Sequence, residues 1–269
     1  LPIGSGLINT NNLYEVVYSF IGISFISSSI YIFNDIKDIS IDLMHPIKKY
    51  RPIASGKIKI LNAFIMGICL LLLGVIILYK NEFTAFLLGL AYFTTALMYT
   101  LKLKYIPYID SATISVLFIV RLLIGGYSAN ISPSIYLTMF IFFSTYGLAV
   151  SKRISILQDD RIQDESEYMQ FLRKYYNLDT LKLIFKGALI STFTTYLVWS
   201  TTIADINNLV FGDIYLVFSI FGLLIMLREI YKMTFEVGLE DFVYSIIQNK
   251  KSIFGLMFTF ICIVIRLYF

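Results

Sequence analysis

The sequence predicts an all-α, polytopic transmembrane bundle that forms a single domain over residues 1–269. Three observations support this prediction. Hydrophobic residues make up 58% of the chain and charged residues only 15%, whereas soluble domains carry roughly 25% charged residues. Apolar windows of about 20 residues, long enough to cross a hydrocarbon core of about 30 Å as helices, recur along the whole chain. Basic residues gather in alternate connections between these windows, a pattern typical of membrane proteins.

Eight apolar windows are expected to span the membrane. In chain order they lie at residues 13–33, 60–79, 83–101, 109–128, 133–151, 182–200, 213–231 and 253–269. Cys69 and Cys262 each fall within a window, where a thiol is a small packing group, so neither indicates a disulfide or a metal site. No tandem repeat or low-complexity linker divides the chain.

The connections between the windows differ sharply in charge. Those at 34–59, 102–110, 151–186 and 228–252 hold 19 of the 22 Lys and Arg residues. The other three, "YKNEF", "SANISPS" and "TTIADINNLVFGD", carry one Lys between them. Because cytoplasmic loops are enriched in Lys and Arg, we expect the four basic connections on the cytoplasmic side of the plasma (inner) membrane, which leaves both chain ends outside.

The first basic connection begins with oxygen-bearing side chains at helical spacing. Asn34, Asp38 and Asp42 recur every four residues, so a helix that continues past Phe33 presents them on one face, about 6 Å apart along the axis. A solvated helix end is the simplest interpretation. However, aspartates on one face repel one another, and a helix C-terminus disfavours anions, so the pattern favours a bound cation. Mg²⁺ prefers oxygen ligands and is often held by one or two carboxylates together with substrate phosphates.

Basic residues follow at once in "HPIKKYRPIASG". His45, Lys48, Lys49 and Arg51 form a cluster suited to phosphate oxygens. A metal on one side and cations on the other would bracket a phosphorylated ligand.

Further candidates lie in the later helices and connections. Tyr99, Lys102 and Lys104 end one window, although lysines at an interface also snorkel without any further role. Lys152 and Arg153 end another, as topology alone would also produce.

Arg121 stands near the middle of "SATISVLFIVRLLIGGYSA", where a charge is costly and faces either a partner or a cavity. It either binds a ligand or pairs structurally with an acid, and both interpretations remain open. The following Gly125 and Gly126 fit close helix packing or a helix break near a cavity.

The combined pattern NDxxDxxxD and "HPIKKYRPIASG" resembles the first aspartate-rich motif of the UbiA-type intramembrane prenyltransferase superfamily. Within it, the chain is most similar to the polyprenyl-phosphate (decaprenyl-phosphate) phosphoribosyltransferase branch, and the similarity extends from about residue 1 to the C-terminus. That branch has nine membrane helices, so the resemblance implies one more helix upstream of Leu1 and a cytoplasmic N-terminus. It also commonly carries a Glu shortly after its Lys and Arg pair. Here "KRISIL" has Ile156, so either Asp159 or Asp160 supplies a second acidic group or the site has fewer carboxylates.

The resemblance implies a magnesium-dependent enzyme that moves 5-phosphoribose from 5-phosphoribosyl 1-diphosphate to a polyprenyl phosphate and releases diphosphate. The expected catalytic residues are Asp38, Asp42, Lys152 and Arg153, and the expected Mg²⁺ ligands are Asn34, Asp38 and Asp42. The expected substrate-binding residues are Asn34, His45, Lys48, Arg51, Tyr99, Lys104 and Arg121.

Two other functions fit parts of the pattern. The acidic motif also suits a prenyltransferase that moves a prenyl group from a prenyl diphosphate to an aromatic or lipid acceptor. A transporter would use Arg121 and the aspartates as an ion pathway. The position of the acids at helix ends on one side, rather than near the midplane, argues against transport.

Overall fold

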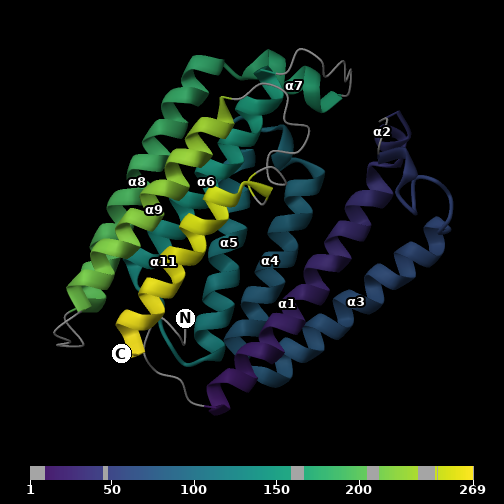
Figure 1. The fold of residues 1–269 in the computed structure, drawn as a ribbon. Helices are drawn as coiled ribbons and strands as arrows, with labels where there is room; N and C mark the ends of the chain where they lie inside the picture. Colours follow the sequence, from purple (N-terminus) through teal and green to yellow (C-terminus); the bar gives the residue numbers. More distant parts are fainter. Residues whose placement is uncertain are drawn as a thin grey trace.

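The computed structural model describes residues 10–44, 48–158, 167–204, 212–235, 246 and 248–268, and the helix labels follow Figure 1. Within these residues, eight long helices run back and forth through the molecule, as the apolar windows predict. They are α1 (Thr10–Lys37), α3 (Ile60–Asn81), α4 (Phe83–Leu101), α5 (Ile109–Ser128), α6 (Ile135–Gln158), α8 (Leu178–Ala204), α9 (Gly212–Thr234) and α11 (Lys250–Tyr268).

Short helices connect the long ones at one end of the bundle. They are α2 (Ile39–Met44), the 3₁₀ turns η1 (Lys48–Tyr50) and η2 (Leu103–Tyr105), and α7 (Glu167–Tyr175). Figure 1 shows α2 and α7 at the end opposite the start of α1 and the end of α11. The basic connections therefore share one end of the molecule, in agreement with the charge pattern.

Seven of the described helices are long and apolar enough to cross a membrane. The eighth predicted window corresponds to α11, which packs along α9. The helices begin and end close to the predicted limits, but α1 and α6 run on at the basic end, to Lys37 and Gln158. This extension matters because candidate site residues that lie beyond the apolar windows are held on helices. The chain is an integral membrane protein.

The long helices form two halves, which meet where α5 packs against α6. Helices α1, α3, α4 and α5 pack together, α6, α8, α9 and α11 form the second group, and α5 packs against α6 between them. Figure 1 shows α1 and α3 on one side and α9 and α11 on the other, with α4 and α5 behind.

Glycines allow the closest helix crossings, as expected in membranes. A Cβ atom on Gly74 of α3 would lie 2.6 Å from the carbonyl oxygen of Gly22 on α1. A similar pair joins α9 and α11, where a Cβ on Gly255 would lie 2.8 Å from the oxygen of Gly222. The sequence left open whether the helix breaks at Gly125 and Gly126. In the structure α5 continues through both residues and ends at Ser128.

Candidate active site

The acidic motif lies where α1 passes into α2. The helical hydrogen bonds continue through the turn at Asp38, because its amide donates to the carbonyl of Asn34 at 2.9 Å and the amide of Asp42 donates to the carbonyl of Asp38 at 2.8 Å. The three predicted oxygen donors therefore follow one another at helical spacing, as the sequence pattern predicts.

Arg51 joins two carboxylates of this motif. Its Nη1 atom lies 2.9 Å from Oδ1 of Asp35 and 3.0 Å from Oδ2 of Asp42. The Asp42 side chain is only 3% exposed, so its charge depends on this partner. Asp35 was not among the predicted ligands. Its spacing of seven residues from Asp42 places both on one helix face, and that spacing was the available signal.

Asp38 has a different partner, on the connection between α4 and α5. Lys104 of η2 lies 3.2 Å from its Oδ1 atom, and both side chains are mostly buried. The neighbouring Lys37 donates to the carbonyl of Thr100 at the end of α4. These contacts join the tip of α1 to the end of α4, so the first two basic connections meet around the acids. The sequence predicted these groups but not their pairing.

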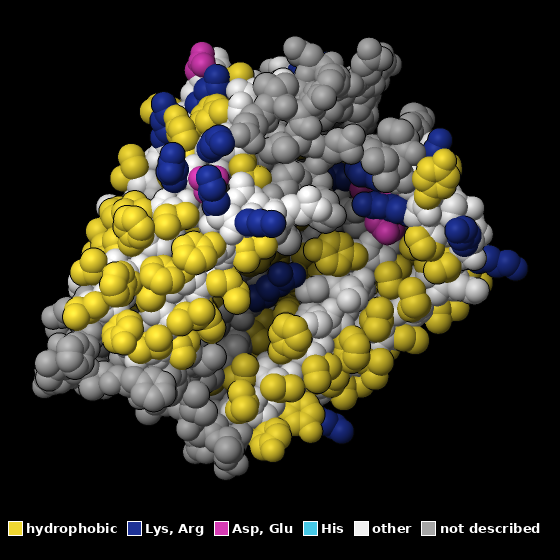
Figure 2. All heavy atoms as spheres, viewed as in Figure 1, with side chains coloured by type: hydrophobic (Ala, Val, Ile, Leu, Met, Phe, Trp, Pro, Cys, Tyr) yellow, Lys and Arg dark blue, Asp and Glu magenta, His cyan; other side chains and the backbone are white. Residues whose placement is uncertain are grey.

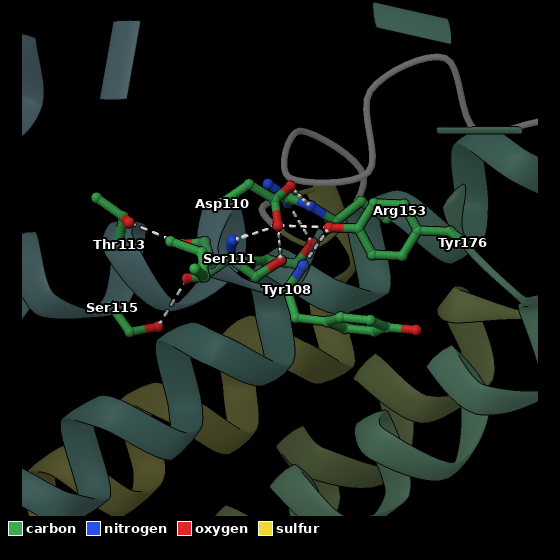
Figure 3. A network of polar contacts seen from close by, with 9 residues as sticks. Tyr108, Asp110, Ser111, Thr113, Ser115, Arg153 and Tyr176 are labelled. Atoms are coloured by element: carbon green, nitrogen blue, oxygen red, sulfur yellow. Dashed lines mark hydrogen bonds and ion pairs between the residues drawn. The ribbon is translucent and has the colours of Figure 1, made fainter. Parts of the chain in front are cut away.

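A second buried network lies at the start of α5 (Figure 3). Asp110 is fully buried, and its Oδ2 atom accepts a 2.7 Å hydrogen bond from Nε of Arg153 on α6. Its Oδ1 atom accepts from the amide and hydroxyl of Ser111 and from the hydroxyl of Tyr176, which lies between α7 and α8. Burial, and then the hydrogen bond to Asp110, raise the pKa of Tyr176 above its usual value, so this phenol stays protonated and acts as the donor.

Tyr99 connects the two networks. Its phenol lies within electrostatic reach of Arg153 and Asp110 in one network and of Lys104 in the other. Tyr99 and Lys104, both predicted substrate-binding residues, therefore lie near each other and near the predicted catalytic Arg153. The adjacent Lys152 is exposed at the same end of α6.

Arg153 is placed differently from the expectation of a phosphate ligand open to substrate. Its side chain is 4% exposed, and a buried carboxylate balances its charge. Besides Asp110, it donates to the carbonyl of Ala149 on its own helix. Its contacts thus include a buried carboxylate and a carbonyl of its own helix, and its catalytic role stays a prediction.

Of the remaining predicted residues, Lys48 is exposed on η1, within electrostatic reach of Asp35. Lys102 is exposed at the end of α4. His45, Asp159 and Asp160 lie outside the described residues, so a second acidic group after α6 stays a prediction.

Arg121 opens onto a cavity of about 520 Å³ between α1 and α5. The cavity is lined mainly by serines and apolar side chains of α1, among them Ser24, Ser27 and Ser28. Nη2 of Arg121 donates to the hydroxyls of Tyr92 and Ser27, and its guanidinium stacks over the Tyr92 ring. Both of these partners of Arg121 are uncharged. Among the described residues, the structure therefore does not show Arg121 paired with an acid, which was the alternative interpretation. Figure 2 shows a hollow between the two halves, with basic side chains in and above it.

The acidic motif fits a divalent cation by its donor chemistry. No three His, Cys, Asp or Glu side chains among the described residues form a complete metal cluster. However, oxygens of Asp35 and Asp42 converge on one point, 2.9 and 3.0 Å from the same Arg51 nitrogen. A cation already occupies that point. Because Mg²⁺ commonly takes only one or two carboxylates and completes its shell with phosphates and water, this incomplete set is compatible with it.

Comparison with known proteins identifies the family of this chain. Residues 8–241 match the UbiA prenyltransferase family, which covers most of the sequence. The chain belongs to the UbiA prenyltransferase family. This confirms the resemblance inferred from the acidic motif, and the family is one of membrane-embedded transferases rather than transporters.

Among UbiA relatives, the chain is 30% identical over 158 residues to decaprenyl-phosphate phosphoribosyltransferase of Corynebacterium glutamicum, covering 56% of this chain and 47% of that protein. It is 28% identical over 144 residues to the enzyme of the same name from Mycolicibacterium smegmatis, covering 54% of this chain and 45% of that one. The chain thus spans about half the length of the curated relatives it matches.

Solved UbiA structures share the fold. The UbiA homologue of Archaeoglobus fulgidus, solved with DMAPP and Mg²⁺, superposes with a TM-score of 0.67 at 14% identity, covering 99% of this chain and 92% of that one. The same homologue solved with GPP and Mg²⁺ gives a TM-score of 0.68, also at 14% identity, covering 96% of this chain and 92% of that one. The all-helical prediction is therefore confirmed.

Proposed function

We propose that this protein transfers 5-phosphoribose from 5-phosphoribosyl 1-diphosphate to a polyprenyl phosphate and releases diphosphate, with Mg²⁺ bound at the acidic motif. The observation that carries the proposal is the meeting of acids and cations at one end of the bundle. Asp35 and Asp42 share Arg51, while Asp38 pairs with Lys104. The relatives named phosphoribosyltransferases support the choice of donor.

The chemistry requires groups that accept negative charge. Departure of diphosphate from the ribose C1 atom builds charge on the leaving group and leaves oxocarbenium character on the sugar. Bound Mg²⁺ would neutralise part of that charge as a Lewis acid. Asn34, Asp38 and Asp42 are the proposed ligands, and the convergence of Asp35 with Asp42 adds Asp35 to them.

The cations of the site would hold the phosphates. Arg51 and Lys104 each lie within 3.2 Å of a carboxylate, so a diphosphate with its metal would exchange these contacts for phosphate oxygens. Lys48, Lys152 and His45 are proposed to contribute from the surrounding connections. Because the acceptor phosphate is already ionised, the residues need only orient its oxygen and exclude water, and a strong general base is not required.

The lipid acceptor would enter from the bilayer. The cavity beside Arg121 lies between α1 and α5 and is lined by side chains compatible with an isoprenoid chain and a polar head. Arg121 is on the same helix as Asp110 and faces α1, which leads to the acidic motif. An active site at the cytoplasmic end of the bundle would allow both a soluble sugar phosphate and a membrane lipid to reach it.

Purified protein in lipid nanodiscs tests the proposal. We expect diphosphate release from 5-phosphoribosyl 1-diphosphate only when both a polyprenyl phosphate and Mg²⁺ are present, with release lost in EDTA and restored by Mg²⁺. When the ribose of the donor is labelled, the label should appear in the lipid product. Absence of labelled lipid under these conditions would refute phosphoribosyl transfer.

A parallel reaction tests prenyl transfer. A relative named digeranylgeranylglyceryl phosphate synthase matches 54% of this chain at 27% identity, so this chemistry is the natural competitor. Supplying geranylgeranyl diphosphate with glyceryl phosphate acceptors should yield no prenylated product if phosphoribosyl transfer is correct. The reverse result would assign the site to prenyl transfer.

A further inference from the structure

Lys37 stands inside the acidic motif, between Asp35 and Asp38. By its charge alone, a lysine at this position opposes the binding of Mg²⁺ to the neighbouring carboxylates, because like charges repel. The spacing of the acids gives it no role in the motif. Its contacts with α4 supply one.

The Lys37 ammonium is directed to the C-terminal end of α4. Its Nζ atom donates a 2.5 Å hydrogen bond to the carbonyl of Thr100 and a longer one, at 3.4 Å, to that of Leu101. These are the last two residues of α4, and Thr100 is buried. The last carbonyls of a helix have no partner within it and carry the negative end of the helix dipole. Lys37 therefore satisfies these oxygens, and the helix end balances part of its charge.

A second lysine spans the same two elements in the opposite direction. Lys104 of η2, three residues past the end of α4, lies 3.2 Å from Oδ1 of Asp38, the residue after Lys37. One lysine thus reaches from α1 to α4, and the other reaches from the end of α4 back to α1. Together the two contacts form a reciprocal clasp, which fixes the tip of α1 against the end of α4.

A bound ligand would act differently on the two halves of this clasp. In the proposed reaction, Asp38 turns to the metal and Lys104 turns to the phosphates, so their ion pair opens. The acceptors of Lys37 are backbone carbonyls of a helix, which cannot turn toward a ligand. The contact from Lys37 to α4 is therefore the half of the clasp that persists when the ligand binds.

We propose that Lys37 is a positioning residue, which holds the tip of α1 against α4 and so keeps the Asp38 carboxylate in place for Mg²⁺ when Lys104 turns to the phosphates. The inference deepens the proposed function and rests on it for the identity of the metal and the phosphorylated ligand. Lys37 acts through the backbone of the next residue and touches neither of them. Ligands that are already in place reduce the cost of ordering the site on binding.

Three variants isolate the contact of Lys37 with α4. Lys37→Met keeps an unbranched side chain and removes the charge and the donors. Lys37→Arg keeps both and should rescue the site. Lys57→Met is the matched control, because Lys57 is an exposed lysine of the connection that follows the acidic motif, and its loss changes the net charge equally. Lys37→Gln, which also removes the charge, provides the same test if Lys37→Met does not insert.

The first measurement needs no ligand. Spin labels at exposed Ser40 on α2 and exposed Met98 in the last turn of α4 report the distance between the two elements, in nanodiscs and without the two native cysteines. Lys37→Met should broaden or lengthen the distribution of this distance, while Lys37→Arg and Lys57→Met should leave it unchanged. An unchanged distribution in Lys37→Met would mean that Lys37 does not hold the elements together.

The second measurement is the Mg²⁺ concentration that gives half-maximal binding of inorganic diphosphate, by calorimetry on the whole protein. Positioning and plain electrostatics predict opposite signs. Loss of a positive charge beside the carboxylates should by itself strengthen Mg²⁺ binding. Loss of positioning should instead raise the half-saturating concentration about three- to tenfold in Lys37→Met, the effect expected for one hydrogen bond. Lys37→Arg and Lys57→Met should behave like the unchanged protein.

The contrary results are distinct. A half-saturating Mg²⁺ concentration that falls or stays constant in Lys37→Met would overturn the inference, and a lower thermal stability alone would then show that the lysine only caps α4. Absence of Mg²⁺-dependent diphosphate binding by the unchanged protein would overturn it together with the proposed ligand. Weaker Mg²⁺ binding in Lys37→Met without transfer from 5-phosphoribosyl 1-diphosphate would sustain this inference and refute only the proposed reaction.

Discussion

Asp42 shows how single residues of the acidic motif are stabilised. It is almost fully buried, and its ion-pair partner among the described residues is Arg51, which it shares with Asp35. Sequence spacing predicted that acids would gather on one helix face, and local electrostatics predicted that they would need a cation. The predicted Mg²⁺ stays a prediction, and the pairing of the acids with Arg51 was not predictable, because Arg51 reaches them through a turn whose path the spacing does not define.

Replacing Asp42 by Ala should reduce the rate of transfer at least about a hundredfold. The variant removes a proposed Mg²⁺ ligand, and such groups contribute several kcal/mol to stabilising the charge of the transition state. The measurement is the initial rate of labelled lipid formation. Asp179→Ala is the control, since Asp179 is an exposed carboxylate at the same end of the bundle, in the first turn of α8. Full activity of correctly inserted Asp42→Ala protein would exclude this role.

Replacing Arg121 by Leu should raise the KM for the polyprenyl phosphate about tenfold or more, and leave the KM for the soluble donor nearly unchanged. The reason is that Arg121 lines the cavity on the membrane side and supplies charged hydrogen bonds there. Arg121→Lys keeps the charge and should retain more of the affinity. Equal effects on both substrates would place Arg121 outside the lipid path.

At the scale of elements, the lengths and ends of the helices followed closely from the apolar windows. The window at 83–101 has the bounds of α4, and that at 109–128 those of α5. At the basic end α1 and α6 extend beyond the apolar windows, and α8, over Leu178–Ala204, extends beyond its window at both ends. Helices continue there because a charged side chain is no obstacle once the helix leaves the hydrocarbon, whereas hydropathy registers only the apolar part.

The crossing of α1 and α3 gives a stability prediction. Gly74→Ala should destabilise the protein by about 1–3 kcal/mol, since the new Cβ would lie 2.6 Å from a backbone oxygen that cannot move alone. Gly187→Ala on α8 is the matched control, because a Cβ there meets nothing within 4 Å. It should be neutral or slightly stabilising through helix propensity. The test is reversible unfolding in mixed detergent. Equal stability of the two variants would contradict the close crossing.

At the scale of the whole molecule, the described parts of the basic connections lie at one end, where α2 and α7 are found (Figure 1). Each pass through the bilayer reverses the side on which the chain emerges, so successive passes put alternate connections on the same side. The cavity near Arg121 lies within one half of the molecule, between α1 and α5.

Membrane sidedness can be checked directly by thiol labelling. In a variant that lacks Cys69 and Cys262, a cysteine at exposed Ser55 should react with an impermeant maleimide only in inverted vesicles. A cysteine at exposed Ser132, in the opposite connection, should react only in intact cells. Labelling of both positions from the same side would contradict the topology, and the reverse pattern would place the acidic motif outside.

The sequence by itself determined the class of fold, the approximate limits of the helices and the place of the acidic motif. It did so because hydropathy and helical spacing are local properties, read within about 20 residues. Tertiary structure alone decided which charges meet. Asp38 pairs with Lys104, Arg153 is buried against Asp110, and Tyr176 donates a hydrogen bond to the same Asp110. These contacts join residues that are 43 to 66 positions apart in the sequence. Such contacts depend on how helices pack, and no local pattern specifies them.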